Sequence, residues 1–241
     1  GHNVGRALGE HGLRVITCLQ GRSDRTRTLA QRAGIDDVAS LNDLVTEADI
    51  VLSILVPAEA VGVAESVAGA LSATGAGTPF ADCNAISPQS ATAIDGIIGH
   101  AGGRFIDGGI IGGPPGRGTP PRFYVSGPHA GVMTELDGKG IDVRPIGESV
   151  GKASGIKMCY AAMTKGTSTL HVALLTAAEA LGLSDELAAE LQASQPGAYE
   201  QMARIPALPV DAARWIGEME EIASTFEHVG VTPGFHRGAA E

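Results

Sequence analysis

A lysine near the start of a long apolar segment is the side chain whose type and position best suit proton-transfer chemistry. Lys157 follows the glycine-containing stretch Gly151–Gly155 and precedes a run rich in Ala and Leu, which indicates a helix. A lysine held near a helix start and partly removed from water has a lowered pKa, so it can exchange a proton with a hydroxyl or carbonyl group. Most lysines only solvate a surface, so the role of Lys157 depends on the elements that position it.

Two hydroxyl-bearing residues share a helix face with this lysine. At 100° per residue, Thr164 lies in a narrow stripe with Lys157, and Tyr160 lies beside that stripe. We interpret Lys157 as the group that exchanges the proton, and Tyr160 or Thr164 as the group that orients a substrate. The alternative is a seam of small residues that packs against another layer while the lysine extends to water. Spacing alone favours that alternative.

Two further segments suit ligand binding. Asn84 follows the short apolar segment Pro79–Asp82, and open parallel sheets bind ligands beyond the ends of their strands. We therefore expect Asn84 to contact a cofactor or substrate, the alternative being a plain turn residue. Gly112 and Gly113 allow backbone amides to approach an anionic ligand closely. A stiff surface loop explains these two glycines equally well.

The first half of the chain alternates segments typical of strands and helices. Strands are expected at 13–19, 49–55, 79–82, 104–107 and 122–126, and helices at 4–10, 24–33, 41–48, 58–71 and 87–100. This alternation predicts an α/β fold, a Rossmann-type parallel sheet with right-handed crossovers.

From Gly151 onward no strand is expected, and helices are predicted over 151–181, 185–195 and 211–229. In the last of these, apolar residues recur at helical spacing while Glu218 and Glu221 are expected to face solvent, the alternative being a wall of the pocket. The break at Arg144–Gly147 is taken as the domain boundary. It separates a Rossmann-like domain, 1–146, from an all-α domain, 147–241, that serves substrate binding and dimerisation.

The opening residues Gly1–Leu8 read as the inside of a helix. A dinucleotide fold needs a strand that runs into a glycine turn, so that the pyrophosphate meets a helix N-terminus. We interpret Gly1 as the last glycine of such a turn, with the first strand missing upstream of residue 1. The alternative is an ordinary terminal glycine.

The strand expected at 13–19, which is the second strand of the fold if one is missing upstream of residue 1, bears on cofactor choice. Sites for NAD usually place an acidic residue at the end of this strand. Here Leu19 and Gln20 are followed by Arg22 and Ser23, which suit a 2′-phosphate and favour NADP over NAD. The alternative is a solvated helix start capped by Ser23, in which case NAD remains possible.

Composition narrows the class of protein. The 241 residues are 44% hydrophobic and 18% charged, with a net charge of -10, which argues against a nucleic-acid partner. No apolar run is long enough for a membrane span, and no leader segment opens the chain. Three widely spaced cysteines suit a reducing cytoplasm. The histidines show no ligand spacing, so no metal is expected.

Several of these segments together resemble the 6-phosphogluconate dehydrogenase and β-hydroxyacid dehydrogenase superfamily, in particular a bacterial branch with a distinctive helical C-terminal domain. Those segments are Gly1–Leu8, Ala48–Pro57, Asp82–Pro88, Phe105–Gly113 and Lys157–Gly166. The resemblance implies that Leu55, Val56 and Pro57 contact the cofactor ribose and that Asn84 lies beside the nicotinamide. It also implies that Gly112 and Gly113 bind substrate and that Lys157 is the catalytic lysine.

Three positions depart from the family pattern. Ile111 stands where the family usually has serine, Ala161 where it has asparagine, and Ala153 where the lysine motif has glycine. Two groups that orient a substrate are therefore absent, which disfavours 6-phosphogluconate and an ordinary 3-hydroxy acid held in the usual way.

The resemblance predicts an NAD(P)-dependent oxidoreductase, a homodimer through its C-terminal helices, that transfers hydride to or from a small hydroxy-acid-like substrate. An imine reductase of the same architecture is the alternative enzyme. A third hypothesis is a protein that binds NADP without turnover.

Overall fold

The computed structural model describes the backbone of residues 1–241 and every side chain except that of Asp211. Packing divides the chain into two compact units, 1–158 and 159–241. The division falls within the long helix α6 (Lys152–Leu181). The first turns of α6 pack with the first unit, whereas the sequence break between residues 146 and 147 precedes the helix. The domain boundary taken from that break stays a prediction.

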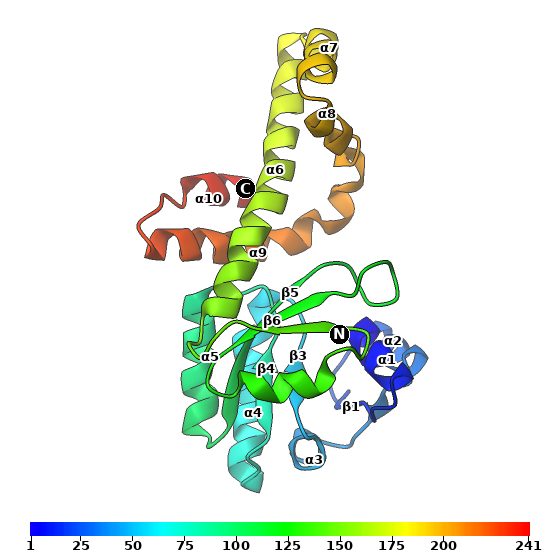
Figure 1. Cartoon of the computed structure of the whole chain (residues 1–241), viewed down its shortest axis with the longest axis vertical. Helices are drawn as coiled ribbons and strands as arrows, with labels where there is room; N and C mark the ends of the chain where they lie inside the picture. The colour runs from blue at the N-terminus through cyan, green and yellow to red at the C-terminus, as the bar shows by residue number, and fades with distance from the viewer. The chain divides into compact units, whose positions relative to one another are not determined.

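The first unit contains two sheets (Figure 1). A two-stranded parallel sheet pairs β1 (Ile16–Thr17) with β2 (Asp36–Asp37). The main sheet has five strands in the order β3-β4-β5-β6-β7. These strands are β3 (Val51–Ser53), β4 (Pro79–Asp82), β5 (Arg104–Ile111), β6 (Arg122–Ser126) and β7 (Asp142–Pro145). All neighbours are parallel except β5 and β6, which form an antiparallel pair.

Local sequence explains where the helices of this unit begin and end. They are α1 (His2–Glu10), α2 (Asp24–Arg32), α3 (Leu41–Glu47), α4 (Ala60–Thr74) and α5 (Pro88–His100), with the 3₁₀ segments η1 (Pro57–Glu59) and η2 (Ala130–Leu136). Ser23, Ser40 and Ser87 each accept a backbone N–H in the first turn of the helix that follows, which satisfies a donor that the helix leaves unpaired. Gly75, with φ of +70°, ends α4.

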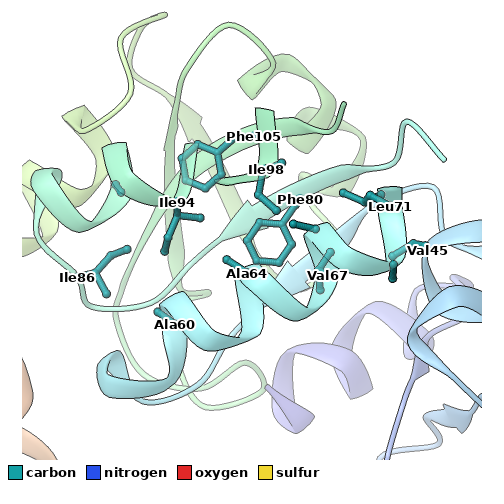
Figure 2. Close-up of a cluster of buried hydrophobic side chains, with 13 residues drawn as sticks. Val45, Ala60, Ala64, Val67, Leu71, Phe80, Ile86, Ile94, Ile98 and Phe105 are labelled. Atoms are coloured by element: carbon teal, nitrogen blue, oxygen red, sulfur yellow. The ribbon is translucent and has the colours of Figure 1, made fainter. Parts of the chain in front are cut away.

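Adjacent residues of the central strands point to opposite faces, and each face has its own core. Phe80 and Phe105 pack on α4 and α5, with ring centroids 6.5 Å apart (Figure 2). Ala81 and Ile106, the next residues along, belong to a second cluster that includes Val4 of α1 and parts of η2. The main sheet is therefore covered on both faces, as in α/β folds.

Two expectations about the sheet were wrong in detail. The sheet is not wholly parallel, because a glycine- and proline-rich hairpin returns β6 antiparallel to β5. The strand expected at 13–19 reduces to Ile16–Thr17, since β1 pairs only with the short β2. The strand β2 was not expected, and neither was the strand β7. Its single buried residue, Val143, gives little alternation of apolar and polar residues to detect.

The second unit holds the rest of α6 and the helices α7 (Ser184–Ser194), α8 (Pro196–Met202), α9 (Pro209–His228) and α10 (Gly234–Ala240), with a 3₁₀ turn η3 (Ile205–Ala207). Met219, Ile222 and Ala223 of α9 are buried, as their helical spacing predicts. Contrary to the expectation that it faces solvent, Glu218 is buried. It is 8% exposed and its carboxylate lies 2.5 Å from the Lys165 ammonium, which also lies 5.4 Å from the centre of the Trp215 ring.

Removing one partner of this buried ion pair should destabilise the protein. Lys165→Met leaves the Glu218 carboxylate buried without its cation, at a cost of about 3 kcal/mol. Lys165→Met/Glu218→Leu should recover most of that loss, as followed by urea unfolding. Arg237→Met, which breaks an ion pair about half exposed, is the matched control and should cost less than about 1 kcal/mol. Equal losses in the single and double variants would contradict this account.

Candidate functional site

A row of buried polar residues crosses four neighbouring strands of the main sheet. Strand register places Ser53 beside Asp82, Asp82 beside Asp107, and Asp107 beside Ser126. Each of the four residues is at most 3% exposed. Buried polar groups need hydrogen-bond partners, and the two carboxylates meet that need with different parts of the chain.

Asp107 holds the start of α6. Its Oδ2 accepts hydrogen bonds from the backbone N–H groups of Gly151, Ala153 and Ser154 at 2.8 to 3.1 Å, and from the Ser126 hydroxyl at 2.8 Å. Its Oδ1 accepts from the Ser154 hydroxyl. A helix N-terminus carries unpaired N–H donors and a partial positive charge, so a carboxylate supplied by a strand stabilises it.

Gly109 brings α6 close to β5. A Cβ atom at this position would lie 2.6 Å from the Ala153 carbonyl oxygen and 2.9 Å from the Lys157 Cβ. Because glycine leaves that space open, the Lys157 side chain runs along the end of β5. Its Nζ donates a hydrogen bond of 2.8 Å to the Ile110 carbonyl oxygen. The half-buried ammonium therefore lies at the carboxyl end of β5 and does not extend into bulk water.

Asp82 and Asn84 hold the loop that follows β3. The Asn84 Nδ2 donates to Asp82 at 2.7 Å and to Ser53 at 2.9 Å, while its Oδ1 accepts the Leu55 N–H at 2.5 Å. Asn84 is 2% exposed. Its side chain thus binds the protein itself, and its predicted contact with a cofactor remains a prediction. Burial raises the pKa of Asp82 to about 6, and the nearby Asp107 adds to this shift.

The N-terminus of α1 lies beside the end of β3, since a Cβ on Gly1 would be 3.4 Å from the Ile54 carbonyl oxygen. The pKa of His2 is lowered, first by burial and then by the positive charges of Arg6 and Arg25. Unpaired N–H groups of a helix start and nearby cations suit an anion such as a pyrophosphate. A dinucleotide cofactor therefore fits the residues at this edge.

The start of α2 contains the two residues predicted to select NADP. Arg22 and Ser23 are both exposed. The Ser23 hydroxyl accepts the Thr26 N–H at 3.4 Å, so it has the capping role weighed as an alternative. Asp37 of β2 accepts the Leu19 N–H at 2.8 Å and thereby places beside β1 a carboxylate that the sequence pattern did not reveal.

The remaining predicted residues lie on loops and on the second unit. Val56 is 44% exposed and Pro57 begins η1, next to Leu55. Gly112 has a φ of +123° directly after β5, and both Gly112 and Gly113 are exposed. The structure thus brings Gly1, Leu55 and Asn84 to one corner of the sheet, and Lys157 to the end of β5.

Tyr160 and Thr164 belong to the second compact unit. Tyr160 is 46% exposed. The Thr164 hydroxyl donates to backbone carbonyls of its own helix, those of Tyr160 at 3.2 Å and Ala161 at 3.3 Å. Their roles toward a substrate remain predictions.

The described side chains contain no cluster of three or more His, Cys, Asp or Glu residues placed to hold a metal ion. Within the described residues, no helix combines the length and the apolar character needed to cross a bilayer. Cys18, Cys83 and Cys159 are free thiols.

Sequence reasoning missed the two aspartates that organise this site. A signal was present, because in each of four strand segments a polar residue directly follows apolar ones. These segments are Val51-Leu52-Ser53, Phe80-Ala81-Asp82, Phe105-Ile106-Asp107 and Tyr124-Val125-Ser126. Only the register of the sheet shows that these residues form one row.

Fold and site together define a Rossmann-like dinucleotide-binding domain followed by a helical domain. Residues 1–135 match the family described as the NAD binding domain of 6-phosphogluconate dehydrogenase, and the chain belongs to that family. Residues 178–241 match a domain of unknown function, DUF1932. The resemblance inferred from the sequence is thereby confirmed.

Individual proteins extend this comparison. An uncharacterized 28.5 kDa protein from Methanothermus fervidus is 31% identical over 173 residues, which are 72% of this chain and 65% of that protein, so the match spans less than two thirds of that relative. A conserved protein of unknown function, described as structurally similar to 3-hydroxyacid dehydrogenases, is 27% identical with a TM-score of 0.73, covering 99% of this chain and 91% of that one. The 3-hydroxyisobutyrate dehydrogenase of Mycobacterium tuberculosis is 18% identical with a TM-score of 0.72, covering 99% and 87%.

Two structures with bound nicotinamide cofactors share the fold at lower identity. Psf3 in complex with NADP+ is 19% identical with a TM-score of 0.65, covering 93% of this chain and 82% of that one. An imine reductase variant from Myxococcus stipitatus in complex with NAD+ is 16% identical with a TM-score of 0.61, covering 100% and 88%. These neighbours show the shared fold, and the family match supports a nicotinamide cofactor.

The close approach at Gly109 can be tested by adding one methyl group. Gly109→Ala should force α6 away from β5 and lower the free energy of unfolding by about 1–3 kcal/mol, measured by urea denaturation. In Gly69→Ala on α4, the new Cβ meets no described atom within 4 Å, so this control should be neutral or slightly stabilising. Unchanged stability of Gly109→Ala would show that α6 does not depend on this contact.

Proposed function

We propose that this protein is an NAD(P)-dependent oxidoreductase that transfers hydride between the nicotinamide and a small hydroxy-acid-like or related carbonyl substrate. The observation that carries the proposal is the position of Lys157. Its ammonium is held at the end of β5 by the Ile110 carbonyl, on a helix whose start is bound by Asp107. Membership in the NAD-binding family supports the cofactor.

Different residues would bind the nucleotide, transfer the proton and orient the substrate. The N-terminus of α1 and the Leu55–Pro57 loop would bind the nucleotide, which supplies the hydride or accepts it. Lys157 would hold the substrate oxygen and exchange its proton as the hydride moves. Gly112 and Gly113 would offer backbone N–H groups to an anionic part of the substrate, and Tyr160 or Thr164 would orient it.

An imine reductase is the second candidate, and two of the three departures from the family pattern favour it. Ile111 is 3% exposed and Ala161 is 1% exposed, so buried apolar side chains stand where the family usually has serine and asparagine. A substrate without the usual hydroxyl and carboxylate needs neither polar group. Reduction of a C=N bond then requires the cofactor and one proton donor, for which Lys157 is our choice.

The role of Lys157 is tested by turnover. Lys157→Ala should lower kcat for any accepted hydroxy acid, carbonyl compound or cyclic imine by about 10²–10⁴-fold, because proton transfer is lost. The affinity for NADPH or NADH, followed by fluorescence, should stay unchanged. Lys152→Ala, at an exposed lysine of the same helix, is the matched control. Equal turnover in Lys157→Ala and wild type would refute the role, and nucleotide binding without turnover of any substrate would favour a non-catalytic binder.

Cofactor preference is tested at the start of α2. We propose NADP as the natural cofactor because the exposed guanidinium of Arg22 suits a 2′-phosphate. Arg22→Ala should weaken NADPH binding several-fold and leave NADH binding unchanged. Tighter binding of NADH than NADPH by the wild-type protein would reverse the assignment.

The free cysteines also suit the proposed cytoplasmic location.

We also propose that the protein is a homodimer through its second unit. Large apolar side chains are exposed along α6, among them Met163 at 71% and Leu170 at 52%. These two residues are seven apart and share one helix face. An exposed apolar stripe on a helix marks an interaction surface.

The dimer is tested by sedimentation. The wild-type protein should sediment as a dimer, and Met163→Glu/Leu170→Glu should dissociate it into monomers, because two carboxylates would enter the apolar interface. Thr176→Glu adds charge at an exposed position on the opposite face of α6 and should leave the dimer intact. A monomeric wild-type protein at micromolar concentration would contradict the proposal.

A further inference from the structure

We propose that Asp82 is a positioning residue for the cofactor: through Asn84 it holds the backbone at Leu55 in the conformation that receives the nucleotide. The inference rests on the proposed function, since it takes a nicotinamide cofactor to bind at this edge of the sheet. It assigns a role to a carboxylate that touches neither cofactor nor substrate in the mechanism above.

The direction of each hydrogen bond fixes the orientation of the Asn84 amide. Because the Leu55 N–H is a donor, it requires the Asn84 oxygen, at 2.5 Å. The amide nitrogen must then face Asp82, where it donates at 2.7 Å. The Asn84 backbone N–H donates to the other carboxylate oxygen at 3.0 Å. Asp82 thus binds both the backbone and the side chain of Asn84. The Asn84 side chain in turn fixes the position of the Leu55 N–H.

The network is closed and dry. Ser53 accepts a hydrogen bond from Asn84 at 2.9 Å, and its own hydroxyl donates to Asp82. Ser53, Asp82 and Asn84 are 3%, 1% and 2% exposed. Water therefore has little access to replace a lost hydrogen bond. When the charge of Asp82 changes, the hydrogen bonds of Ser53 and Asn84 have to rearrange.

An ionised carboxylate suits this network and a neutral carboxyl does not. Asp82 receives three hydrogen bonds, from the two Asn84 N–H groups and the Ser53 hydroxyl, and an ionised carboxylate only accepts. A proton on either oxygen needs an acceptor, and among these neighbours only the Ser53 hydroxyl can turn to accept it. Protonation therefore removes the charge that strengthens both Asn84 N–H bonds, and the hold of Asn84 on Leu55 loosens.

Other titratable groups lie around this carboxylate. Burial is the main cause of the raised pKa of Asp82, and Asp107, beside it on β5, adds to the shift. The Cys83 thiol that follows also has a pKa raised by burial. Lys157 is bound further along, at the Ile110 carbonyl. With the pKa of Asp82 raised from 3.8 to about 6, the carboxyl gains its proton as the pH falls through about 6. Cofactor affinity should then be highest above pH 7 and should fall on acidification.

The experiment measures two quantities on the full chain between pH 5 and 8. The first is the hydrogen-exchange protection factor of the Leu55 amide without nucleotide, and the second is the Kd for NADPH and for NADH. In the wild-type protein both should weaken together with a midpoint near pH 6, the Kd by roughly 10-fold, the effect of one lost hydrogen bond. NADH has no 2′-phosphate, so its Kd excludes titration of the ligand.

Three variants separate the network from general effects. Asp82→Asn should bind weakly at every pH and show no midpoint. Asp49→Asn, which removes an exposed carboxylate just before β3, should behave as wild type. Ser53→Ala removes one donor to the charged form, so its midpoint should move to higher pH. This mild substitution keeps the test decisive if Asp82→Asn fails to fold.

Two results would overturn the inference: Leu55 protection and Kd that do not change between pH 5 and 7.5, or an unshifted midpoint in Ser53→Ala. If the wild-type protein binds neither nucleotide at any pH, the proposed function fails and the cofactor role of Asp82 fails with it. The Leu55 exchange profile is measured without nucleotide, so it still shows whether the network itself responds to pH.

Discussion

Two buried carboxylates stand side by side at the centre of the main sheet, and the arrangement of the site depends on how each is satisfied. Asp107 accepts three backbone N–H groups at the start of α6, so the helix that contains Lys157 begins where a strand residue binds it. Asp82 accepts from Asn84, so the loop after β3 is bound to β4. Ser126 and Ser53 complete the row on either side. A buried charge is costly in free energy unless it is hydrogen-bonded. The hydrogen bonds that satisfy the two carboxylates hold the helix and the loop against the sheet.

The absence of a side chain is as important as these bonds. Gly109 lies two residues beyond Asp107 on the same face of β5, and its missing Cβ lets α6 approach until the Lys157 stem lies over the strand. Gly108, on the opposite face, leaves room for Cys83, whose sulfur would be 2.8 Å from a Cβ there. The Asp-Gly-Gly sequence of β5 thus combines an anchor for α6 with the space that α6 needs.

Two of the three departures from the family pattern, Ile111 and Ala161, fall outside this framework, whereas Ala153 lies within it because Asp107 accepts its backbone N–H. Ile111 and Ala161 are buried apolar residues where the family usually has polar ones, whereas the bonds that place Lys157 involve Asp107, Gly109 and Ile110. A chain can therefore keep the position of its lysine while changing the groups that recognise the substrate.

Much of this protein followed from the sequence alone. The alternation of strands and helices, the serine caps of α2, α3 and α5 and the helical second half are all local patterns, set by residue spacing and backbone preference. Tertiary structure alone decided that β6 runs antiparallel, that Glu218 is buried against Lys165, and that Ser53, Asp82, Asp107 and Ser126 form one row. These facts depend on which distant segments pair and in what register, and a polar residue at the end of a strand carries no local sign of its partner across the sheet.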